Sequence, residues 1–203
     1  MCSRYELNTP PERMIERFGL RVPETVTRQW SAHKFAFDEI RPTNIAPIVL
    51  QERRLEAIPW GLAVSWQSQP LIHARAETLD SKPTFKPLLQ NRCVVPASAY
   101  FEWRRDGKAK IKTRIASDDQ DLFAFAGLTD GERFTIVTCE PAASIAHIHH
   151  RMPVILGEDA TTAWLDRARS YAEVKPLLVP FNGKLAWTEP QASDTGRQPR
   201  LFG

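Results

Sequence analysis

Apolar and polar positions alternate with the period of a β-strand through most of the middle of the chain. From about Ile45 onward, short apolar runs are separated by polar or turn-forming residues, a pattern typical of half-buried strands. Two Asp-Gly pairs, at 106–107 and 130–131, stand between such runs and favour tight hairpin turns. The runs predicted as strands are 48–50, 55–62, 92–95, 100–104, 111–115, 122–128 and 134–138.

Helical patterns are confined to four segments. Thr9, two prolines and Glu12 have the order of an N-cap, a first turn and a capping-box glutamate, which predicts a helix that ends at Gly19. Further helices are predicted at 83–89, 158–165 and 171–178. This order of elements predicts one α+β domain over residues 1–190, in which a curved, mainly antiparallel sheet carries the site. Residues 191–203 are expected to form a flexible tail.

Composition narrows the class of protein. With 203 residues, 42% hydrophobic and 25% charged, the chain has enough apolar residues for one ordinary core. Its three cysteines are widely spaced, so we expect no disulfide framework, no metal and no cofactor, and a reducing compartment. We find no signal-peptide core and no membrane-length apolar run, which predicts a soluble, cytoplasmic monomer, nucleoid-associated if bacterial. The net charge of +3 favours an anionic partner only weakly.

The second residue carries distinctive chemistry. Removal of Met1, which is favoured before a small residue, would make Cys2 the N-terminus and create a 1,2-aminothiol. Its α-amine, with a reference pKa near ~7.7 to 8.0, and its thiol, near ~8.5, are two adjacent nucleophiles. An aldehyde can condense with the amine to a Schiff base, which the sulfur then closes into a five-membered thiazolidine. A cysteine at this position is usually accidental, so the hypothesis needs partner residues.

Two later residues are candidates for proton transfer. Strand alternation puts Glu102 on the face opposite Phe101 and Trp103, where desolvation among aromatics would raise its pKa. An exposed strand would instead leave it an ordinary surface carboxylate, and both interpretations stay open. His149 lies in a cluster of three histidines without a carboxylate or cysteine at ligand spacing, so we interpret it as an acid/base residue rather than a metal ligand. Arg151 beside it is predicted to hold a phosphate.

Side chains suited to a nucleic-acid strand occur in the middle of the chain. His73 and Arg75 share a face if their segment is extended, although a solvated edge explains them equally well. Trp60 and Trp66 are candidates for the core or for a surface on which unpaired bases stack. The segment 104–114 holds six basic residues and one acidic residue, a ribbon that can follow a phosphate backbone or simply face solvent.

Eight short motifs occur in one order along the chain. They are Met-Cys-Ser-Arg-Tyr at 1–5, Asn-Ile-Ala-Pro at 44–47, Trp-Gly-Leu at 60–62, Ala-Arg-Ala-Glu-Thr at 74–78, Arg-Cys-Val-Val-Pro-Ala at 92–97, Phe-Glu-Trp at 101–103, Phe-Ala-Gly-Leu at 125–128 and His-His-Arg-Met-Pro-Val-Ile-Leu at 149–156. Together they resemble the SRAP family, named for SOS-response-associated peptidase, whose members are known as abasic-site DNA-protein crosslinkers. Each motif is modest evidence, but eight in sequence order are specific.

The resemblance implies a compact, barrel-like α+β domain with peripheral helices and a basic channel for single-stranded DNA. It implies that Cys2 crosslinks the aldehyde of an abasic site, that Glu102 moves protons during Schiff-base formation, and that His149 assists sugar ring opening. Such a protein responds to DNA damage, with lyase-like or autopeptidase-like chemistry that is suicidal or slowly reversible. The residues assigned to DNA contact are Arg4, Arg75, Arg151, Trp60, Trp66, Asn44 and Pro47.

The chain departs from the family pattern at two positions. His73 stands where the family usually has an asparagine that positions the cysteine, and histidine is bulkier and titrates near neutrality. We therefore count His73 among the catalytic residues and expect slower or more pH-dependent crosslinking. Ser3 stands where glycine is common and is expected to stiffen the turn beside the nucleophile.

Two alternatives of different classes remain open. One is an N-terminal-nucleophile cysteine peptidase or amidohydrolase, because some amidotransferases also begin with Met-Cys. The other is a non-catalytic module that binds single-stranded DNA, motivated by His73 and the basic segment. A separate hypothesis concerns the tail, where the stretch from Gln198 to Phe202 resembles the peptides that dock on bacterial sliding clamps.

Overall fold

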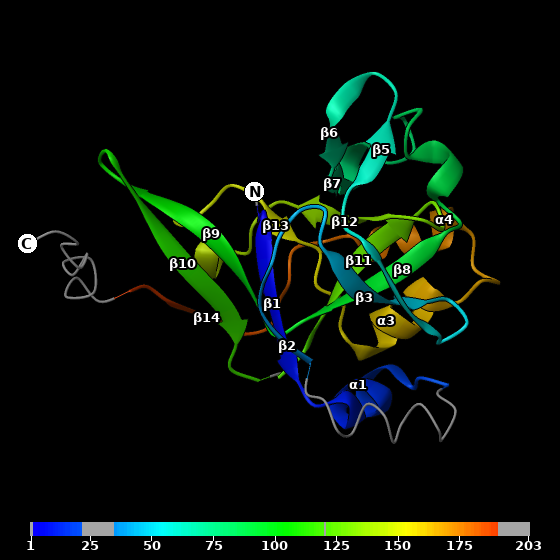
Figure 1. Ribbon diagram of the computed structural model, residues 1–203, viewed down its shortest axis with the longest axis horizontal. Coiled ribbons are helices and arrows are strands. Elements are labelled where there is room, and N and C mark those ends of the chain that lie inside the picture. The colour runs from blue at the N-terminus through cyan, green and yellow to red at the C-terminus, as the bar shows by residue number, and fades with distance from the viewer. Residues whose placement is uncertain (1, 22–34, 120, 191–203) are drawn as a thin grey trace, which may run out of the picture.

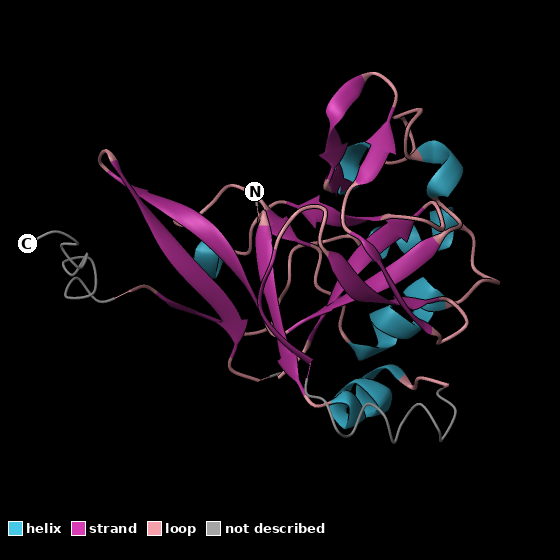
Figure 2. Ribbon diagram, in the orientation of Figure 1, coloured by secondary structure: helices cyan, strands magenta, loops and turns pink. Residues whose placement is uncertain are grey.

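Two sheets account for most of the protein (Figures 1 and 2). The computed structural model describes residues 2–21, 35–119 and 121–190. The five-stranded sheet has the order β14-β10-β9-β1-β2, and the larger sheet has the order β13-β12-β11-β8-β3-β4 with β7 added to β12. Named strands pair antiparallel except β7 with β12. A separate hairpin of β5 and β6 projects from this body (Figure 1).

The five-stranded sheet joins distant parts of the chain, because β1 pairs with β9 and β10 with β14, whereas the hairpin pairs neighbouring segments. Those of the first sheet are β1 Arg4–Thr9, β2 Phe35–Ile40, β9 Ala99–Asp106, β10 Ala109–Ser117 and β14 Leu185–Thr188. Those of the larger sheet are β3 Ile45–Leu50, β4 Leu55–Pro59, β7 His73–Arg75, β8 Arg92–Ala97, β11 Phe123–Thr129, β12 Phe134–Cys139 and β13 Met152–Pro153. The hairpin consists of β5 Leu62–Val64 and β6 Gln67–Leu71.

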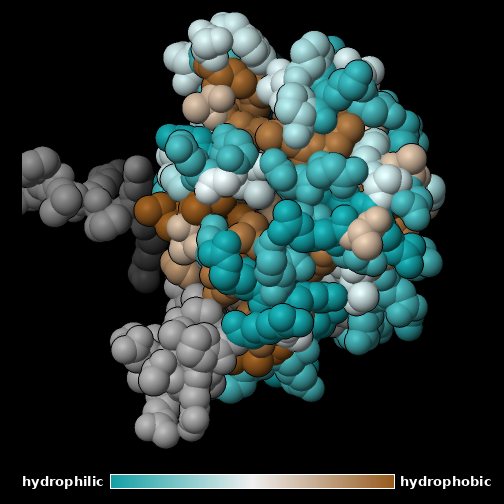
Figure 3. Space-filling model, turned by 90° about the vertical axis from the view of Figure 1, so that its right-hand side faces the viewer, coloured by the Kyte–Doolittle hydropathy of each residue, from teal (hydrophilic) through white to brown (hydrophobic). Residues whose placement is uncertain are grey.

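The helices are short and peripheral. The α-helices are α1 Pro11–Phe18, α3 Glu158–Leu165 and α4 Tyr171–Val174, and the 3-10 turns are η1 Ala76–Thr78, η2 Lys86–Leu88, η3 Ala143–Ile145 and η4 Lys175–Leu177. Within the described ranges no helix is long and apolar enough to cross a membrane. The side that carries α3 and α4 shows mainly hydrophilic side chains, with apolar patches between them (Figure 3).

The core lies between the two sheets and beneath α3. Every residue of β8, β11 and β12 is buried, as expected for strands covered on both faces. The rings of Tyr5 and Tyr100 in the first sheet meet Phe125 of the larger one edge to face, with centroids 6.2 and 5.9 Å apart. On the other side, Arg92 donates to the carbonyl oxygens of Trp164 and Asp166 at 2.7 Å, which satisfies the last carbonyls of α3. These contacts fix β8 and its neighbour β11 in place.

The predicted fold class is confirmed. Both hairpin turns also lie at the predicted positions, at the two Asp-Gly pairs. Asp106 pairs with Ala109 across the first turn, and Thr129 pairs with Phe134 across the second. The glycines of these turns have φ values of 57° and 95°, which side chains disfavour. Helix α3 also has the predicted bounds.

Several predicted boundaries were wrong. The segment 83–89 forms only a 3-10 turn, and 171–178 divides into α4 and η4, because Pro87 and Pro176 have no N–H to continue an α-helix. Pro10 rather than Thr9 caps α1, without a side-chain hydrogen bond, because Thr9 belongs to β1. The predicted strand 55–62 breaks at Gly61, whose φ is 116°.

Candidate functional site

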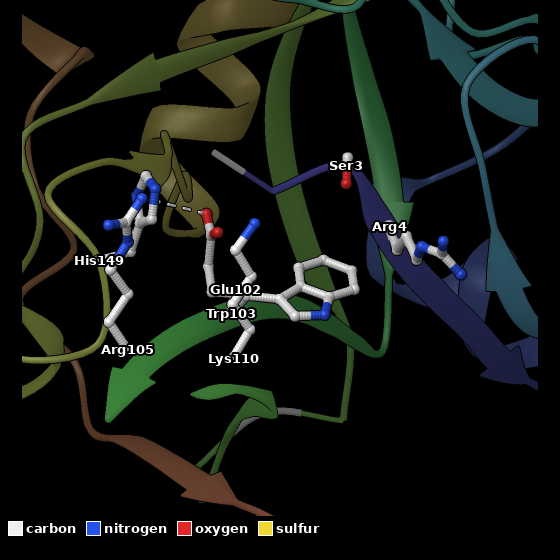
Figure 4. A pocket seen from close by; sticks show the side chains of 7 residues that line it. All are labelled: Ser3, Arg4, Glu102, Trp103, Arg105, Lys110 and His149. Carbon is white, nitrogen blue, oxygen red and sulfur yellow. Dashed lines mark ion pairs between the residues drawn. The ribbon is translucent and has the colours of Figure 1, made fainter. Parts of the chain in front are cut away.

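A pocket of about 350 Å³ opens where the N-terminal segment of the chain passes the β9–β10 hairpin (Figure 4). Three segments that are far apart in the sequence reach it: the N-terminal residues, the hairpin, and the loop between η3 and β13. This convergence of acidic, basic and aromatic groups in one concave site is typical of a binding or reaction site. The lining residues are Ser3, Arg4, Glu102, Trp103, Arg105, Lys110 and His149.

Glu102 lies on the inner wall of this pocket. It belongs to β9, pairs across the hairpin with Thr113, and has only 1% of its surface exposed. Burial raises its pKa to about 7, and this shift is opposed first by the N-terminal ammonium and then by hydrogen bonds from the backbone N–H groups of Cys2 and Trp103. The buried interpretation of Glu102 is therefore the correct one. A carboxyl group with this pKa can both give and take a proton near neutral pH.

His149 faces Glu102 from the opposite wall. Its Nδ1 lies 3.7 Å from Oε1 of Glu102, as the dashed line in Figure 4 marks. The backbone N–H of Arg151 donates to the same Nδ1 at 3.1 Å, which holds the ring at the pocket. Burial lowers the pKa of His149 to about 4, so the imidazole is neutral near pH 7. The His149 ring also stacks on His150, with centroids 4.3 Å apart.

Cys2 lies directly behind Glu102. Its side chain has 1% of its surface exposed, and its Sγ donates to the backbone oxygen of Arg4 at 3.1 Å. Burial, and then the nearby Glu102 carboxylate, raise the pKa of this thiol. The chain described here still includes Met1, so the backbone nitrogen of Cys2 is an amide rather than an amine.

His73 approaches the same residue from β7. Burial lowers the pKa of His73 to about 4, while hydrogen bonding to the backbone of Cys2 opposes this shift. Its buried Nε2 has no hydrogen-bond partner within the described residues. The Trp60 ring packs edge-on at 6.0 Å from the His73 ring. His73 is therefore neutral near pH 7, and the expected titration near neutrality is shifted to more acidic pH.

Comparisons with known proteins identify the family of this chain. The family model described as "SOS response associated peptidase (SRAP)" matches residues 1–192. The chain belongs to the SRAP family. The abasic site processing protein YoqW of Bacillus subtilis is 34% identical, over 90% of this chain and 88% of its own. The abasic site processing protein YedK of Escherichia coli is 34% identical, over 71% of this chain and 74% of its own. A crystal structure of a Bacteroides thetaiotaomicron protein superimposes with a TM-score of 0.78 at 26% identity, covering 97% of this chain and 95% of the other.

The candidate DNA contacts of this SRAP domain divide into exposed and buried residues. Arg75, Asn44 and Trp66 are exposed, and Trp66, with 64% of its surface accessible, lies between β5 and β6 at the end of their hairpin. Arg75 makes no ion pair or hydrogen bond within the described ranges, so its charge is available to an anion. DNA contact through these three residues stays a prediction.

Trp60 and Pro47 are buried, which does not fit the expected contact with bases. Trp60 has no exposed surface, and its Nε1 donates to the backbone oxygen of Ile72 at 2.9 Å. Pro47 is buried within β3. In this structure Trp60 supports β7 and His73 from the core, because its ring is enclosed on both sides and cannot stack on a base.

Arg151 is also engaged inside the protein rather than presented to a phosphate. Its Nη1 and Nη2 bind the two carboxylate oxygens of Glu77 at 2.6 and 2.9 Å, and Nη2 donates to the backbone oxygen of Thr138 at 2.7 Å. Only 8% of Arg151 is exposed. These contacts hold the loop that carries His149, so Arg151 is a positioning residue.

Arg4 lies at the pocket rim, as a phosphate-binding residue would. It forms an ion pair with Glu39 of β2, and its guanidinium lies 5.4 Å from the centre of the Trp103 ring. Trp103 also lines the pocket but was not singled out from the sequence, whereas Ser3 was noted only as a departure from the family pattern, and Arg105 and Lys110 only as members of the basic segment. Strand alternation in the basic segment, which puts 103, 105 and 110 on one face, is the signal that would have found three of them.

The histidine cluster does not form a metal site. His150 is stacked on His149, whereas His147 contacts the ring of Trp187 at a centroid distance of 5.5 Å. Across the described residues, no group of three or more His, Cys, Asp or Glu side chains is placed to hold a metal ion.

Proposed function

We propose that this protein processes abasic sites in single-stranded DNA by forming a covalent bond between Cys2 and the aldehyde of the ring-opened sugar. The proposal is supported by Glu102 and His149, which face each other at one pocket, and by hydrogen bonding between Glu102 and the backbone of Cys2, whose side chain is buried. The names of the relatives point to the same substrate. Removal of Met1 must come first, because only then does the nitrogen of Cys2 become a nucleophilic amine.

His149 would act on the sugar before the bond forms. An abasic sugar exists mainly as a closed hemiacetal, and opening it requires proton removal from the C1′ hydroxyl and proton delivery to the ring oxygen. A neutral imidazole can accept a proton at one nitrogen and donate from the other. The lowered pKa of His149, about 4, keeps it in that neutral form.

Glu102 would act on the amine and then on the carbinolamine. As a carboxylate it takes a proton from the Cys2 ammonium, and as an acid it returns a proton to the hydroxyl group that leaves as water. Both forms are populated near its pKa of about 7. The hydrogen bond that Glu102 accepts from the backbone nitrogen of Cys2, an amide until Met1 is removed, supports this role, because that nitrogen becomes the amine.

The thiol completes the linkage. Because burial raises its pKa, the Cys2 thiol is protonated near neutrality, so the amine reacts with the aldehyde first. The sulfur then adds to the carbon of the Schiff base while the thiol proton passes to the nitrogen, which closes the thiazolidine. One water leaves overall and no oxidant or reductant is needed.

The test uses protein expressed without an N-terminal tag and checked by intact mass for loss of Met1. Single-stranded DNA with one abasic site and an undamaged strand are incubated with wild type, Cys2→Ala and Cys2→Ser, and products are separated under denaturing conditions. We expect a heat-stable, lesion-dependent band in wild type without any reductant. Cys2→Ala and Cys2→Ser, which keep the α-amine but lack the sulfur, should give only a Schiff-base product that is seen after trapping by borohydride.

A different result would favour another class of function. Equal binding of damaged and undamaged strands by fully processed protein, with no covalent band, would contradict covalent capture and support a binding module. Glutamine or peptide hydrolysis that needs no DNA would support an amidohydrolase or peptidase.

We also propose that the stretch from Gln198 to Phe202 docks on a bacterial sliding clamp. It lies outside the described residues, so the proposal rests on the Gln-Pro-Arg-Leu-Phe sequence alone. Deletion of residues 198–203 should abolish clamp binding in a pull-down and leave crosslinking unchanged. Retained clamp binding would contradict it.

A further inference from the structure

The β9–β10 hairpin presents one strongly basic face beside the pocket. Residues directly opposite each other in an antiparallel pair share a face, and Arg105 pairs with Lys110 while Trp103 pairs with Lys112. Arg4 of β1 joins this face through its contact with the Trp103 ring. We call this surface the basic face, which comprises Arg4, Trp103, Arg105, Lys110, Lys112 and Arg114.

Away from the hairpin turn, acidic residues partly compensate the charge of this face. Glu39 forms ion pairs with Arg4 and Lys112, and these cations hold its pKa at about 2 despite the opposing effect of partial burial. Glu6 accepts hydrogen bonds from two nitrogens of Arg114, with Nε at 3.0 Å from Oε2. These three cations therefore each contact a carboxylate of the protein, and Arg4 and Lys112 share the same one.

Nearer the turn, Arg105 and Lys110 have no such compensation. Both are exposed, and neither forms an ion pair within the described part of the chain. The acidic residues of this region, Asp106 and Glu189, instead bind Arg104 on the opposite face, at 3.7 and 2.7 Å. Because two like charges directly opposite each other destabilise a hairpin, an anionic ligand bound between them would relieve their repulsion.

We propose that Arg105 and Lys110 form a phosphate subsite for the DNA strand whose abasic sugar enters the pocket. Both side chains line the pocket together with Glu102 and His149, whereas Arg4 lies beyond Trp103 (Figure 4). A phosphate on this pair therefore lies on the reactive side of the pocket, where it would place the flanking sugar next to Glu102. This inference rests on the proposed function, because it assumes that DNA occupies the pocket.

The test compares two double variants that lose the same charge. Arg105→Gln/Lys110→Gln removes the subsite, and Lys82→Gln/Lys86→Gln removes two exposed lysines that lie outside the pocket and make no ion pair among the described residues. Binding of an undamaged single strand is measured over a range of salt concentrations. Each lost phosphate contact should lower the slope of log K against log salt by about 0.7, so we expect a drop of about 0.7 to 1.4 for the first variant.

The control variant should keep nearly the wild-type slope. Thermal unfolding provides a second readout, because removing two opposed charges should leave the melting temperature of the Arg105→Gln/Lys110→Gln protein unchanged or higher. Weaker DNA binding in a protein of equal or greater stability is not expected from a merely structural role. Equal slopes in the subsite variant and wild type would overturn the subsite, as would an equal loss in both variants.

The outcome is separable from that of the proposed function. If wild type gives no covalent product but the subsite variant binds undamaged strands with a reduced slope, the subsite stands and covalent capture fails. If wild type crosslinks and the subsite variant binds and crosslinks at subsaturating DNA as wild type does, covalent capture stands and the subsite fails.

Discussion

Two carboxylates meet the loop that carries His149, and their environments are opposite. Glu77 receives two hydrogen bonds from the permanently charged Arg151, which lower its pKa. Glu102 faces the neutral imidazole of His149 at 3.7 Å, and burial raises its pKa to about 7. Glu77, which is paired with a permanently charged guanidinium, holds the loop in place, whereas Glu102, whose pKa is raised by burial, can exchange protons.

The largest effect is expected from Glu102→Gln, which keeps the shape of the side chain but removes its proton exchange. We predict a fall of about 10² to 10⁴ in the rate of crosslinking, the usual contribution of a general acid or base. Single-turnover kinetics with excess protein would measure it. Glu102→Asp is the informative second variant. It keeps a carboxyl group on a side chain that is one methylene shorter, so it should retain part of the crosslinking rate that Glu102→Gln loses.

The same substitution should change how stability depends on pH. A carboxyl whose pKa is raised from its ordinary value of 4.5 to about 7 stabilises the fold fully below 4.5, and this contribution is lost as pH rises through 7. By the linkage relation the loss amounts to about 3 kcal/mol for so buried a group. Urea unfolding at pH 5 and pH 8 should show this decrease in wild type and a smaller one in Glu102→Gln. An equal decrease in both proteins would contradict the assignment.

The next effect is expected from Arg151→Met, which removes the charge that holds Glu77. The free energy of unfolding should fall by about 1 to 3 kcal/mol, less than for a fully buried pair because Glu77 is partly exposed. Crosslinking should slow through displacement of His149, with the shape of its pH profile unchanged. A changed pH profile at an unchanged free energy of unfolding would make Arg151 a participant in proton transfer instead.

A smaller effect is expected from His73→Asn. The pKa of His73, lowered by burial to about 4, keeps it neutral above about pH 5, so the substitution should change the crosslinking rate by a similar factor throughout pH 6 to 8. We expect an increase of several fold, since the smaller amide can hydrogen-bond the Cys2 backbone with less crowding. Rate ratios that vary strongly between pH 6 and 8 would show that His73 titrates there.

The smallest effect is expected from Glu77→Gln, the counterpart of the first substitution. Because the Glu77 side chain is 47% exposed, solvent screening should limit the loss of stability to less than about 1 kcal/mol. Crosslinking should stay within about twofold of wild type, since an amide oxygen can still accept one hydrogen bond from Arg151. A rate loss comparable to that of Glu102→Gln would remove the distinction between the two carboxylates.

Local chemistry explains which parts of the fold could be predicted from the sequence. The Asp-Gly turns and helix α3 depend on neighbouring residues, so their positions were predicted correctly. Strands β1 and β14 were missed because each is held mainly by pairing with distant strands, β1 with β9 and β14 with β10. The first residue of α1 and the last residue of α4 depend on nearby prolines, and the pattern of apolar positions does not show where these prolines begin or end a helix.

The site shows the same division. The motif around Cys2, Glu102 and His149 could be identified from the sequence, but the burial of Glu102 depends on segments a hundred residues away. The sequence predicts a phosphate contact for Arg151. Its partner Glu77 lies 74 positions earlier in the chain, so the local sequence does not show that the charge is already paired. For Trp60 the sequence left both the core and a stacking surface open, because nothing in its local sequence shows that the larger sheet encloses it. Charge compensation by distant residues is the information that the sequence pattern lacks.

Proton transfer by Glu102 depends on a pKa near 7, which keeps this carboxyl near the midpoint of its titration at neutral pH. The most direct measurement is a carbon-13 NMR titration of the glutamate side-chain carboxyl groups between pH 4 and 9, with the Glu102 signal assigned by its absence in Glu102→Gln. We predict that this signal titrates near pH 7, separately from the other glutamates. A Glu102 signal that titrates near pH 4.5 would contradict the account, because that carboxyl would then be an ordinary anion with no proton to give.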